Sequence, residues 1–365
     1  MLLGDPVKQI DKGFLFDTWS LGRNNLAIRA TFLQDATLLN FTMPHSVVDA
    51  HSLFDVVCAF CALLKNDPIH KIQLPPDVRG IQMSRLVRDD VQGEKQPIDS
   101  DCQASYNDHR QTWRPNLYSI TKVCGNNFKT EFLTSKLGFS KMQDTLICIP
   151  QKWLDTARKE CMRERDLDES LGNITTQLSK NDTMIAWFLK LLFGHESQRE
   201  SIDLLCPLDI HAFTKQEESE APYLHNDFST PRCHFTAAEL KKNPNHWIAN
   251  RVRNTLLSYR NAASARDYWR FLEDSASKIK MPNSTGQSVY VTSWAAFDFA
   301  NLDFSGATAH GDSMSRPPVL FLCPKVSGRL LSVVDGFFVS WKDANGDFWI
   351  RGCMPADVIR SLDVL

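Results

Sequence analysis

Residues 40–65, NFTMPHSVVDAHSLFDVVCAFCALLK, decide the fold of the first third of the chain. They follow two β-rich segments within residues 26–43, and a short polar break at Gln34-Asp35 separates these segments, so we predict a hairpin. From Ala50 to Lys65 apolar residues recur at helical spacing with almost no helix breaker. We therefore predict a mostly buried helix there, joined to the hairpin by a strand-to-helix junction.

The same stretch contains two pairs with HxxxD spacing, His45 with Asp49 and His51 with Asp55. A chain with ten histidines should contain roughly half of one such pair by chance, so the spacing alone is weak. His45 follows a strand and a proline, where a ring can be held rigidly with one nitrogen facing a cleft. Asp49 could then anchor the nearby backbone or pair with a cation. A junction histidine bonded to local backbone is the alternative for His45.

His51 and Asp55 lie at i and i+4 within the predicted helix body. This position favours a surface or capping role over catalysis. The context of the two pairs therefore ranks His45 above His51 as a candidate for chemistry.

The composition indicates a globular chain: 43% of its 365 residues are hydrophobic and 23% are charged. The net charge of −2 gives no electrostatic reason to expect nucleic acid or an anionic membrane surface as a partner. No apolar run approaches the roughly 18 residues of a membrane span, and the first residues turn polar too soon for a secretory signal. We expect a cytoplasmic enzyme or binding protein.

Ten cysteines are spread through the sequence, and Cys58 and Cys61 form its CxxC spacing. This pair lies in an apolar stretch without a second pair or a nearby HxxH. Buried reduced thiols in a helix are favoured over a metal or redox site.

Strands and helices alternate along the rest of the chain without a repeat, which predicts an α/β protein in two similar halves. An exposed loop is expected at 88–105. We expect helices from about Pro150, after Ser179 (capped by Ser179 or Asn181) and over 247–281, strands at 145–149, 201–210, 288–294, 317–325 and 329–341, and a turn at Asn345-Gly346.

A second stretch, TSWAAFDFANLDFSG at 292–306, changes the weight of His45. A strand ending in Ser-Trp followed by Asp-Phe-Ser-Gly, with HxxxD some 250 residues upstream, resembles the BAHD acyltransferase family. That family pairs HxxxD(G) with a later DFGWG-type motif. SKNDTMIAWFLK (179–190) and LLCPLDIHAF (204–213) resemble two further motifs of the family, in the same order.

The resemblance implies two chloramphenicol acetyltransferase-like α/β domains, with mixed sheets flanked by helices and an active-site channel at their interface. It implies an N-terminal half at 1–115 carrying HxxxD, a crossover connection at 116–140 and a C-terminal half at 141–365 carrying the DFSG loop. Only 44 residues precede His45, fewer than family members carry, so we expect an incomplete N-terminal domain.

The resemblance also implies transfer of an acyl group, acetyl by analogy with fungal relatives, from coenzyme A to a hydroxyl or amine of a specialised metabolite. His45 would be the general base and Asp49 its orienting, structural neighbour. Ser293 and Trp294 are candidates to stabilise the oxyanion, through a backbone, hydroxyl or indole donor. Acyl-CoA would be a co-substrate, without a bound cofactor or metal, and a monomer is expected.

The sequence departs from the family pattern at three places. Ala50 replaces the glycine after the motif aspartate. DFSGA replaces DFGWG, in which Asp303, Phe304 and Gly306 would shape a structural loop near the coenzyme A side. His211 stands where the family has the arginine that pairs with the motif aspartate, so the partner of Asp49 would be His211 or a different arginine.

Two alternatives stay open. One is a truncated, non-catalytic relative that binds a metabolite or a partner without turnover. The other is a condensation domain or a carrier-protein-dependent transferase of the same ancestral fold. The second is less favoured, because those proteins carry HHxxxDG, whereas Pro44 precedes His45 and Ala50 follows Asp49 in this chain.

Overall fold

The computed structural model describes residues 26–43, 48–69, 142–171, 176–194, 201–210, 213, 227–275, 287–307, 317–319, 321–323 and 336–362. Contacts divide the chain into two units. Unit 1 contains Met1–Gly80, Gln216–Phe228 and Ala296–Lys325, and unit 2 contains Ile81–Lys215, Ser229–Ala295 and Val326–Leu365. The DFSG turn thus groups with the N-terminal residues. The crossover expected at 116–140 lies outside the described residues, as does the loop expected at 88–105, so the domain boundaries stay a prediction.

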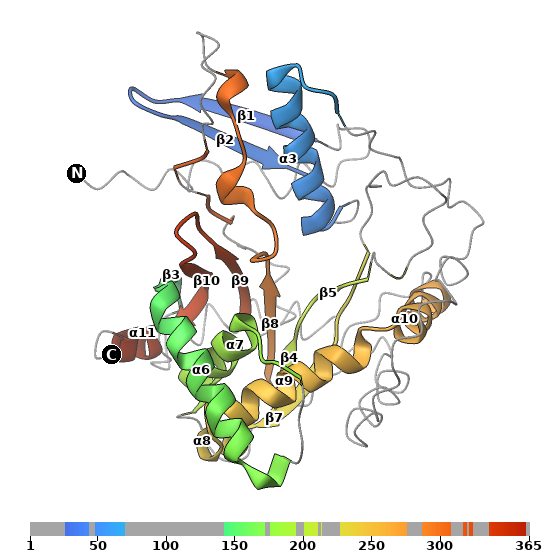
Figure 1. Ribbon diagram of the computed structural model, residues 1–365, viewed down its shortest axis with the longest axis vertical. Helices are drawn as coiled ribbons and strands as arrows, with labels where there is room; N and C mark the ends of the chain where they lie inside the picture. The colour runs from blue at the N-terminus through green and yellow to red at the C-terminus, as the bar shows by residue number, and fades with distance from the viewer. Residues whose placement is uncertain are drawn as a thin grey trace, which may run out of the picture. The chain divides into compact units, whose positions relative to one another are not determined.

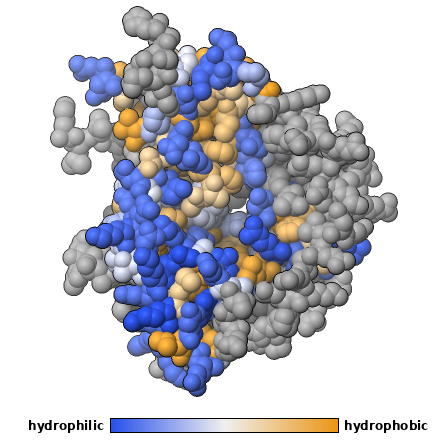
Figure 2. Space-filling model, in the orientation of Figure 1, coloured by the Kyte–Doolittle hydropathy of each residue, from blue (hydrophilic) through white to orange (hydrophobic). Residues whose placement is uncertain are grey.

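Unit 1 contains the hairpin that the sequence predicts. Strands β1 (Ala27–Phe32) and β2 (Thr37–Thr42) pair in antiparallel register, and the turn between them lies at the predicted polar break. The Leu33 amide donates to the Ala36 carbonyl at 2.8 Å to close it. Apolar side chains near this turn are exposed, Phe32 by 80%, and Figure 2 shows hydrophobic atoms at the surface in this region.

Helix α3 spans Ala50–Lys65, the range predicted from the sequence. The expectation that it is mostly buried was wrong: its buried residues are Ser52, Val56, Val57 and Cys61, and Leu63 is 57% exposed. Its four buried residues lie on one stripe of the helix, and most of its other residues are half-buried. On that stripe Phe60 packs edge-on against Phe41 of β2, with ring centroids 5.2 Å apart.

Unit 2 is built on a six-stranded mixed sheet in the order β3-β10-β9-β8-β4-β7 (Figure 1). Strand β8 pairs in parallel with both β4 and β9, and the remaining pairs are antiparallel. The strands are β3 (Met142–Ile149), β4 (Ser201–Leu205), β7 (Arg232–Thr236), β8 (Gln287–Ser293), β9 (Gly336–Lys342) and β10 (Phe348–Pro355).

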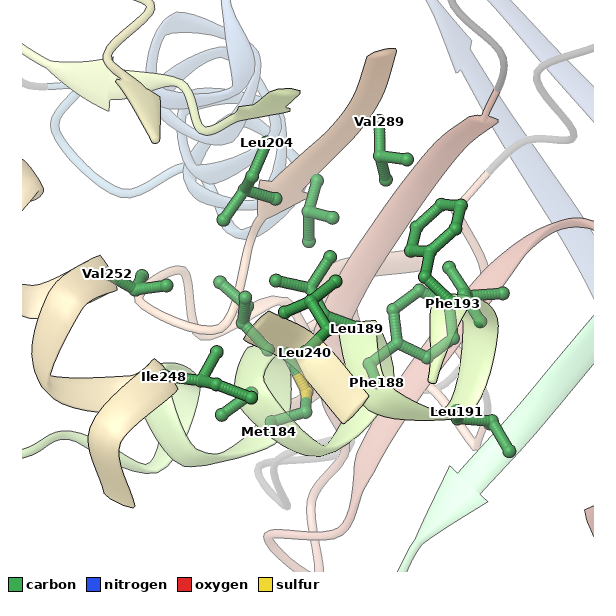
Figure 3. Packing of buried hydrophobic residues seen from close by; sticks show 14 of the residues in the cluster. Met184, Phe188, Leu189, Leu191, Phe193, Leu204, Leu240, Ile248, Val252 and Val289 are labelled. Carbon is green, nitrogen blue, oxygen red and sulfur yellow. The ribbon is translucent and has the colours of Figure 1, made fainter. Parts of the chain in front are cut away.

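Helices pack on one face of this sheet, where Figure 3 shows apolar side chains of α7, α8 and α9 against those of β4 and β8. The helices of unit 2 are α6 (Gln151–Leu167), α7 (Lys180–Phe193), α8 (Ala237–Lys242), α9 (Asn245–Tyr259), α10 (Ala262–Ser275) and α11 (Ala356–Leu362), with a short 3-10 turn at Glu169–Leu171. In the described part of the chain, no helix has both the length and the apolar character needed to cross a membrane.

Ser179 caps α7, as one of the two predicted candidates. Its hydroxyl accepts a hydrogen bond from the Asp182 amide, while the Asp182 carboxylate accepts one from the Ser179 amide, which forms a capping box. Arg253 of α9 pairs with this buried carboxylate at 2.6 Å. The SKND stretch therefore fixes the start of α7 and ties it to α9.

The structure corrects two of the predicted strands. The strand expected over 201–210 ends at Leu205, because Pro207 cannot donate to a ladder. Two short strands, β5 (Leu208–Asp209) and β6 (Phe228–Ser229), are separate from the large sheet.

The strand expected at 317–325 is absent from its described residues, 317–319 and 321–323, where two consecutive prolines interrupt any ladder.

The remaining C-terminal predictions fare better. Strand β9 confirms the second half of the strand expected at 329–341, and residues 329–335 lie outside the described part. The turn at Asn345-Gly346 is confirmed, with Gly346 in the left-handed region at φ 85°. Strand β10 and helix α11 were not predicted.

Phe188 provides a test of this core. Its ring is 1% exposed and packs edge-on against Phe338 of β9, with centroids 4.7 Å apart. We expect Phe188→Ala to lower the free energy of unfolding by about 3–5 kcal/mol, because the deletion removes apolar burial and leaves a cavity. Denaturant unfolding measures this loss. Leu167→Ala, at a residue 75% exposed on α6, is the control and should change stability by less than about 0.5 kcal/mol. Similar losses for the two variants would contradict the assigned core.

Candidate functional site

The residues predicted to carry the site are distributed over both units. Asp49, Asp303, Phe304 and Gly306 lie in unit 1, and Ser293 and Trp294 lie in unit 2. His45 and His211 lie outside the described residues. The geometry of the site is therefore built from the residues around them.

Asp49 is the N-cap of α3 and is 8% exposed. One carboxylate oxygen accepts the Ser52 amide at 2.9 Å, the ordinary arrangement of an N-cap aspartate. The other oxygen accepts the Asp227 amide at 3.0 Å, from a segment 178 residues later in the sequence. Asp49 therefore joins the start of α3 to the backbone at residue 227. The pairing of Asp49 with His211 or an arginine stays a prediction.

Sequence patterns do not reveal Asp227, because this residue takes part through its backbone amide. A backbone donor has no preferred side chain and so leaves no motif. The local context of Asp49 did contain a signal: an aspartate directly before a helical apolar run is a standard N-cap.

The second HxxxD pair lies on the surface of α3. The His51 Nε2 and the Asp55 Oδ2 are 4.0 Å apart, with side chains 40% and 20% exposed. The His51 ring also meets Phe297 edge-on, with centroids 5.6 Å apart. This arrangement agrees with the structural role expected for the pair.

Residues 297–307 run along α3 and contact it at two levels. At mid-helix, Phe54 packs against Phe297 and Phe299, with ring centroids 5.7 and 5.0 Å apart. Phe299, in the 3-10 turn Phe299–Asn301, also stacks on Phe321 at 4.4 Å. The sequence between the Ser-Trp and DFSG landmarks therefore supplies the aromatic packing surface for α3.

At the C-terminal end of α3, the DFSG turn sits directly on the helix backbone. A Cβ on Gly306 would clash with the Leu64 carbonyl and lie 2.6 Å from the Lys65 nitrogen, so only glycine fits there. Asp303 accepts the Ser305 amide at 2.9 Å, and its other oxygen pairs with the Lys65 ammonium at 3.0 Å. Gly306, at the position where the family motif has tryptophan, thus allows the backbone of the turn to approach the backbone of α3 closely.

The turn itself is regular. Ser305–Ala307 forms one 3-10 turn, and the Ala307 amide donates to the Phe304 carbonyl at 3.0 Å. Asp303, Phe304 and Gly306 accordingly act as parts of a structural turn on α3.

Cys58 and Cys61 are free thiols on α3. The prediction that they are buried is confirmed for Cys61, whereas Cys58 is half-buried. Burial raises the pKa of each thiol to about 11, with a smaller contribution from Asp55 at Cys58. Neither is activated as a thiolate near neutral pH. Among the residues that the structure describes, no group of three or more His, Cys, Asp or Glu side chains is arranged to hold a metal ion.

Ser293 is the last residue of strand β8 in unit 2, and Trp294 follows it directly. The Trp294 amide donates to the Ser340 carbonyl of β9 at 2.7 Å, so this backbone donor is used within the sheet. Consecutive strand residues point to opposite faces. Ser293 shares its face with Val289 and Val291, which belong to the helix-covered core, and Thr292 lies on the other face. Any donor from Trp294 to a substrate must therefore be its indole.

Curated proteins similar in sequence are fungal acyltransferases. An acetyltransferase of Penicillium patulum, peniE, is 27% identical over 94% of this chain and 74% of its own length. An O-acyltransferase of Aspergillus ustus, pboC, is 22% identical over 88% of this chain and 65% of its own length. No protein-family model matches the chain.

Solved structures with a similar fold include TRI101 of F. sporotrichioides, complexed with coenzyme A and T-2. It has a TM-score of 0.60 and 12% identity, over 93% of this chain and 67% of that chain. Vinorine synthase has a TM-score of 0.52 and 10% identity, over 92% of this chain and 63% of that chain. The expected α/β fold, with a mixed sheet flanked by helices as in two-domain acyltransferases, is confirmed.

The two hydrogen bonds of Asp49 can be tested separately. Asp49→Ala removes both acceptors and should lower the free energy of unfolding by about 1–2 kcal/mol for the cap alone. Asp49→Asn keeps one oxygen, and asparagine is as good an N-cap as aspartate, so the variant can retain the Ser52 bond and lose the bond to Asp227. Denaturant unfolding should therefore place the asparagine variant between the wild type and the alanine variant. Equal stabilities of all three proteins would contradict the assigned bonds.

Proposed function

We infer that this chain, a member of the BAHD acyltransferase family, transfers an acyl group from coenzyme A to a hydroxyl or amine of a small metabolite. The observation that carries the proposal is the junction before α3. There the motif aspartate, Asp49, is a buried N-cap bonded to the backbone at residue 227, and His45 precedes it by four residues.

The names of the similar proteins support the reaction class. Two relatives are described as an acetyltransferase and an O-acyltransferase. TRI101 of F. graminearum has been solved with coenzyme A and T-2 mycotoxin, and with coenzyme A and deoxynivalenol. For this chain we propose an acyl-CoA donor, acetyl-CoA first, and a hydroxylated specialised metabolite as the acceptor.

In the proposed mechanism His45 is the general base. A neutral imidazole has a pKa near 6.5 and can accept the acceptor's hydroxyl proton at neutral pH. The oxygen then attacks the thioester carbonyl, and a tetrahedral oxyanion forms. Collapse of this intermediate breaks the carbon–sulfur bond, and His45 returns its proton to the departing thiolate. The products are an ester and free coenzyme A, without a covalent enzyme intermediate.

Asp49 has a positioning role in this scheme. Its carboxylate is occupied by the Ser52 and Asp227 amides, which suits holding the junction in place. It needs no part in proton transfer, because the imidazole both takes and returns the proton.

The oxyanion needs a hydrogen-bond donor, which is typically worth about 2.7–4 kcal/mol in the transition state. We propose the C-terminal end of β8, with the Thr292 hydroxyl or the indole of Trp294, the residue after the strand, as the donor. Ser293 is less suited, since it shares its face with the helix-covered core.

The general base can be tested by thiol release. Purified protein is mixed with acetyl-CoA and a panel of hydroxylated metabolites, and free thiol is followed. We expect His45→Ala to lower kcat by about 10²–10⁴-fold, the usual contribution of a general base. His51→Ala, in the neighbouring HxxxD pair, is the matched control and should stay close to wild type. Turnover that survives His45→Ala would exclude this residue as the base, and no turnover by either protein would favour a non-catalytic relative.

The same assay gives a pH profile. A base must be deprotonated to act, so kcat/KM should rise with pH and level off above an apparent pKa near 6.5. A profile that is flat from pH 5 to 8 would argue against an imidazole base.

The oxyanion proposal is tested by removing one candidate hydrogen-bond donor at a time. Thr292→Val keeps the shape of the side chain and should lower kcat by about tenfold or more if its hydroxyl is the donor. Trp294→Phe tests the indole in the same way. Ser293→Ala reports on the opposite face. A loss confined to Ser293→Ala would reverse the assignment.

We also propose a monomer that acts in the cytoplasm, without nucleic acid or membrane as a partner. Sedimentation of the purified chain and fractionation of the producing cells test these two points.

A further inference from the structure

Helix α3 is held at both of its ends by residues from distant parts of unit 1. At its start, Asp49 accepts the Asp227 amide. At its last turn, the ammonium of Lys65 pairs with Asp303 at 3.0 Å. We propose that Lys65 is a positioning residue for the acyl-transfer site: with Gly306 it locks the DFSG turn onto α3 and so fixes the helix that Asp49 caps. This inference rests on the proposed function for its catalytic consequence.

We call the attachment of the DFSG turn to α3 by Lys65, Asp303 and Gly306 the lock. It combines an ion pair with a steric fit. The Asp303 carboxylate uses one oxygen for the Ser305 amide and the other for Lys65, so it fixes the shape of the turn and its attachment to the helix together. Gly306 lets the turn approach the Leu64 carbonyl closer than any residue with a Cβ could. The turn therefore fits the helix at one position. If the turn slid along α3, both the ion pair and the close approach of Gly306 would be lost.

Helix α3 can transmit this constraint because it is a continuous rod of 16 residues, roughly 24 Å long. Packing of Phe54 against Phe297 and Phe299 holds its middle against the same segment that carries the turn. A displacement of the last turn of α3 relative to the DFSG turn would therefore tilt or shift the start of the helix. Misplacement by about 1 Å at a catalytic group can cost on the order of 10²-fold in rate.

The charges at the two ends agree with this role. A carboxylate at the helix start and an ammonium in its last turn each complement the helix dipole. The hydrogen bond to Asp303 raises the pKa of Lys65. The stability that this ion pair contributes is therefore fully present below the ordinary pKa of lysine, and it is lost only as the pH rises through the higher pKa of the folded state. The lock is therefore constant across neutral pH.

A second carboxylate near Lys65 provides a control. Asp67 lies 3.5 Å from the same ammonium, but it follows the helix end and is 54% exposed. If the charge of Lys65 mattered only for solubility or local repulsion, Asp67 and Asp303 would be equivalent. If Lys65 acts through the turn, Asp303 matters and Asp67 does not.

The test measures both catalysis and local protection in Lys65→Met. For catalysis we expect kcat for thiol release to fall about tenfold with KM for acetyl-CoA unchanged. For protection we expect the amide of Asp227 to exchange with deuterium about fivefold faster, because its bond to Asp49 opens more often. Lys65→Arg, which keeps the charge, should restore both values.

Two control variants separate this role from a general loss of charge. Asp67→Asn removes the charge of the neighbouring carboxylate. Lys180→Met removes an ion pair in unit 2, in which the Lys180 ammonium lies 2.7 Å from the Asp155 carboxylate. The exposure of the Lys180 side chain is similar to that of Lys65. Both should leave kcat and the Asp227 exchange rate as in the wild type. Gly306→Ala should behave like Lys65→Met, and if it fails to fold, the lysine variants still decide the question.

The outcomes distinguish the positioning role from the proposed function. If wild-type protein releases no thiol with any acceptor, acyl transfer is overturned, and deuterium exchange alone tests the lock. Unchanged Asp227 exchange in Lys65→Met would overturn the lock even if kcat fell. A raised KM for acetyl-CoA with normal kcat and exchange would also overturn it, since Lys65 would then contact the donor.

Discussion

The buried carboxylate of Asp49 is the interaction on which unit 1 depends. A single side chain accepts hydrogen bonds from the Ser52 amide in the first turn of α3 and from the amide of Asp227. A buried carboxylate is costly unless such donors meet it, so the start of the helix and the backbone at residue 227 have to come together. The DFSG turn then constrains the opposite end. A helix held in this way presents the residues at its N-terminal junction from a fixed position.

Unit 2 solves a different physical problem. Strand β8 lies between two parallel neighbours, β4 and β9, and parallel pairing requires long crossovers. The connection from β4 to β8 contains α8, α9 and α10, and α7 immediately precedes β4. Helices α7, α8 and α9 cover the sheet face of Val289 and Val291. One face of β8 thus packs into the core, and Thr292 lies on the other face.

Local patterns predicted much of this fold. The apolar spacing of Ala50–Lys65 gave both ends of α3 correctly, because its caps are short-range features. Long-range partners were not predictable in the same way. The amide of Asp227 carries no side-chain signal, and the need for glycine at position 306 arises from the Leu64 backbone far away in the sequence. The prediction of a strand at 317–325 was wrong because it gave more weight to the apolar residues of this stretch than to its two consecutive prolines.

The attachments of α3 also set an order for the synthesis of the protein. The helix is translated well before its partners: Asp49 meets a residue 178 positions later, and Lys65 meets one later still. At about 5–20 residues per second, that interval lasts on the order of 10–35 seconds. During this time the apolar stripe of α3 lacks its final neighbours. Unit 1 can be completed only after most of unit 2 has been translated, so the nascent chain has to keep this surface from aggregating.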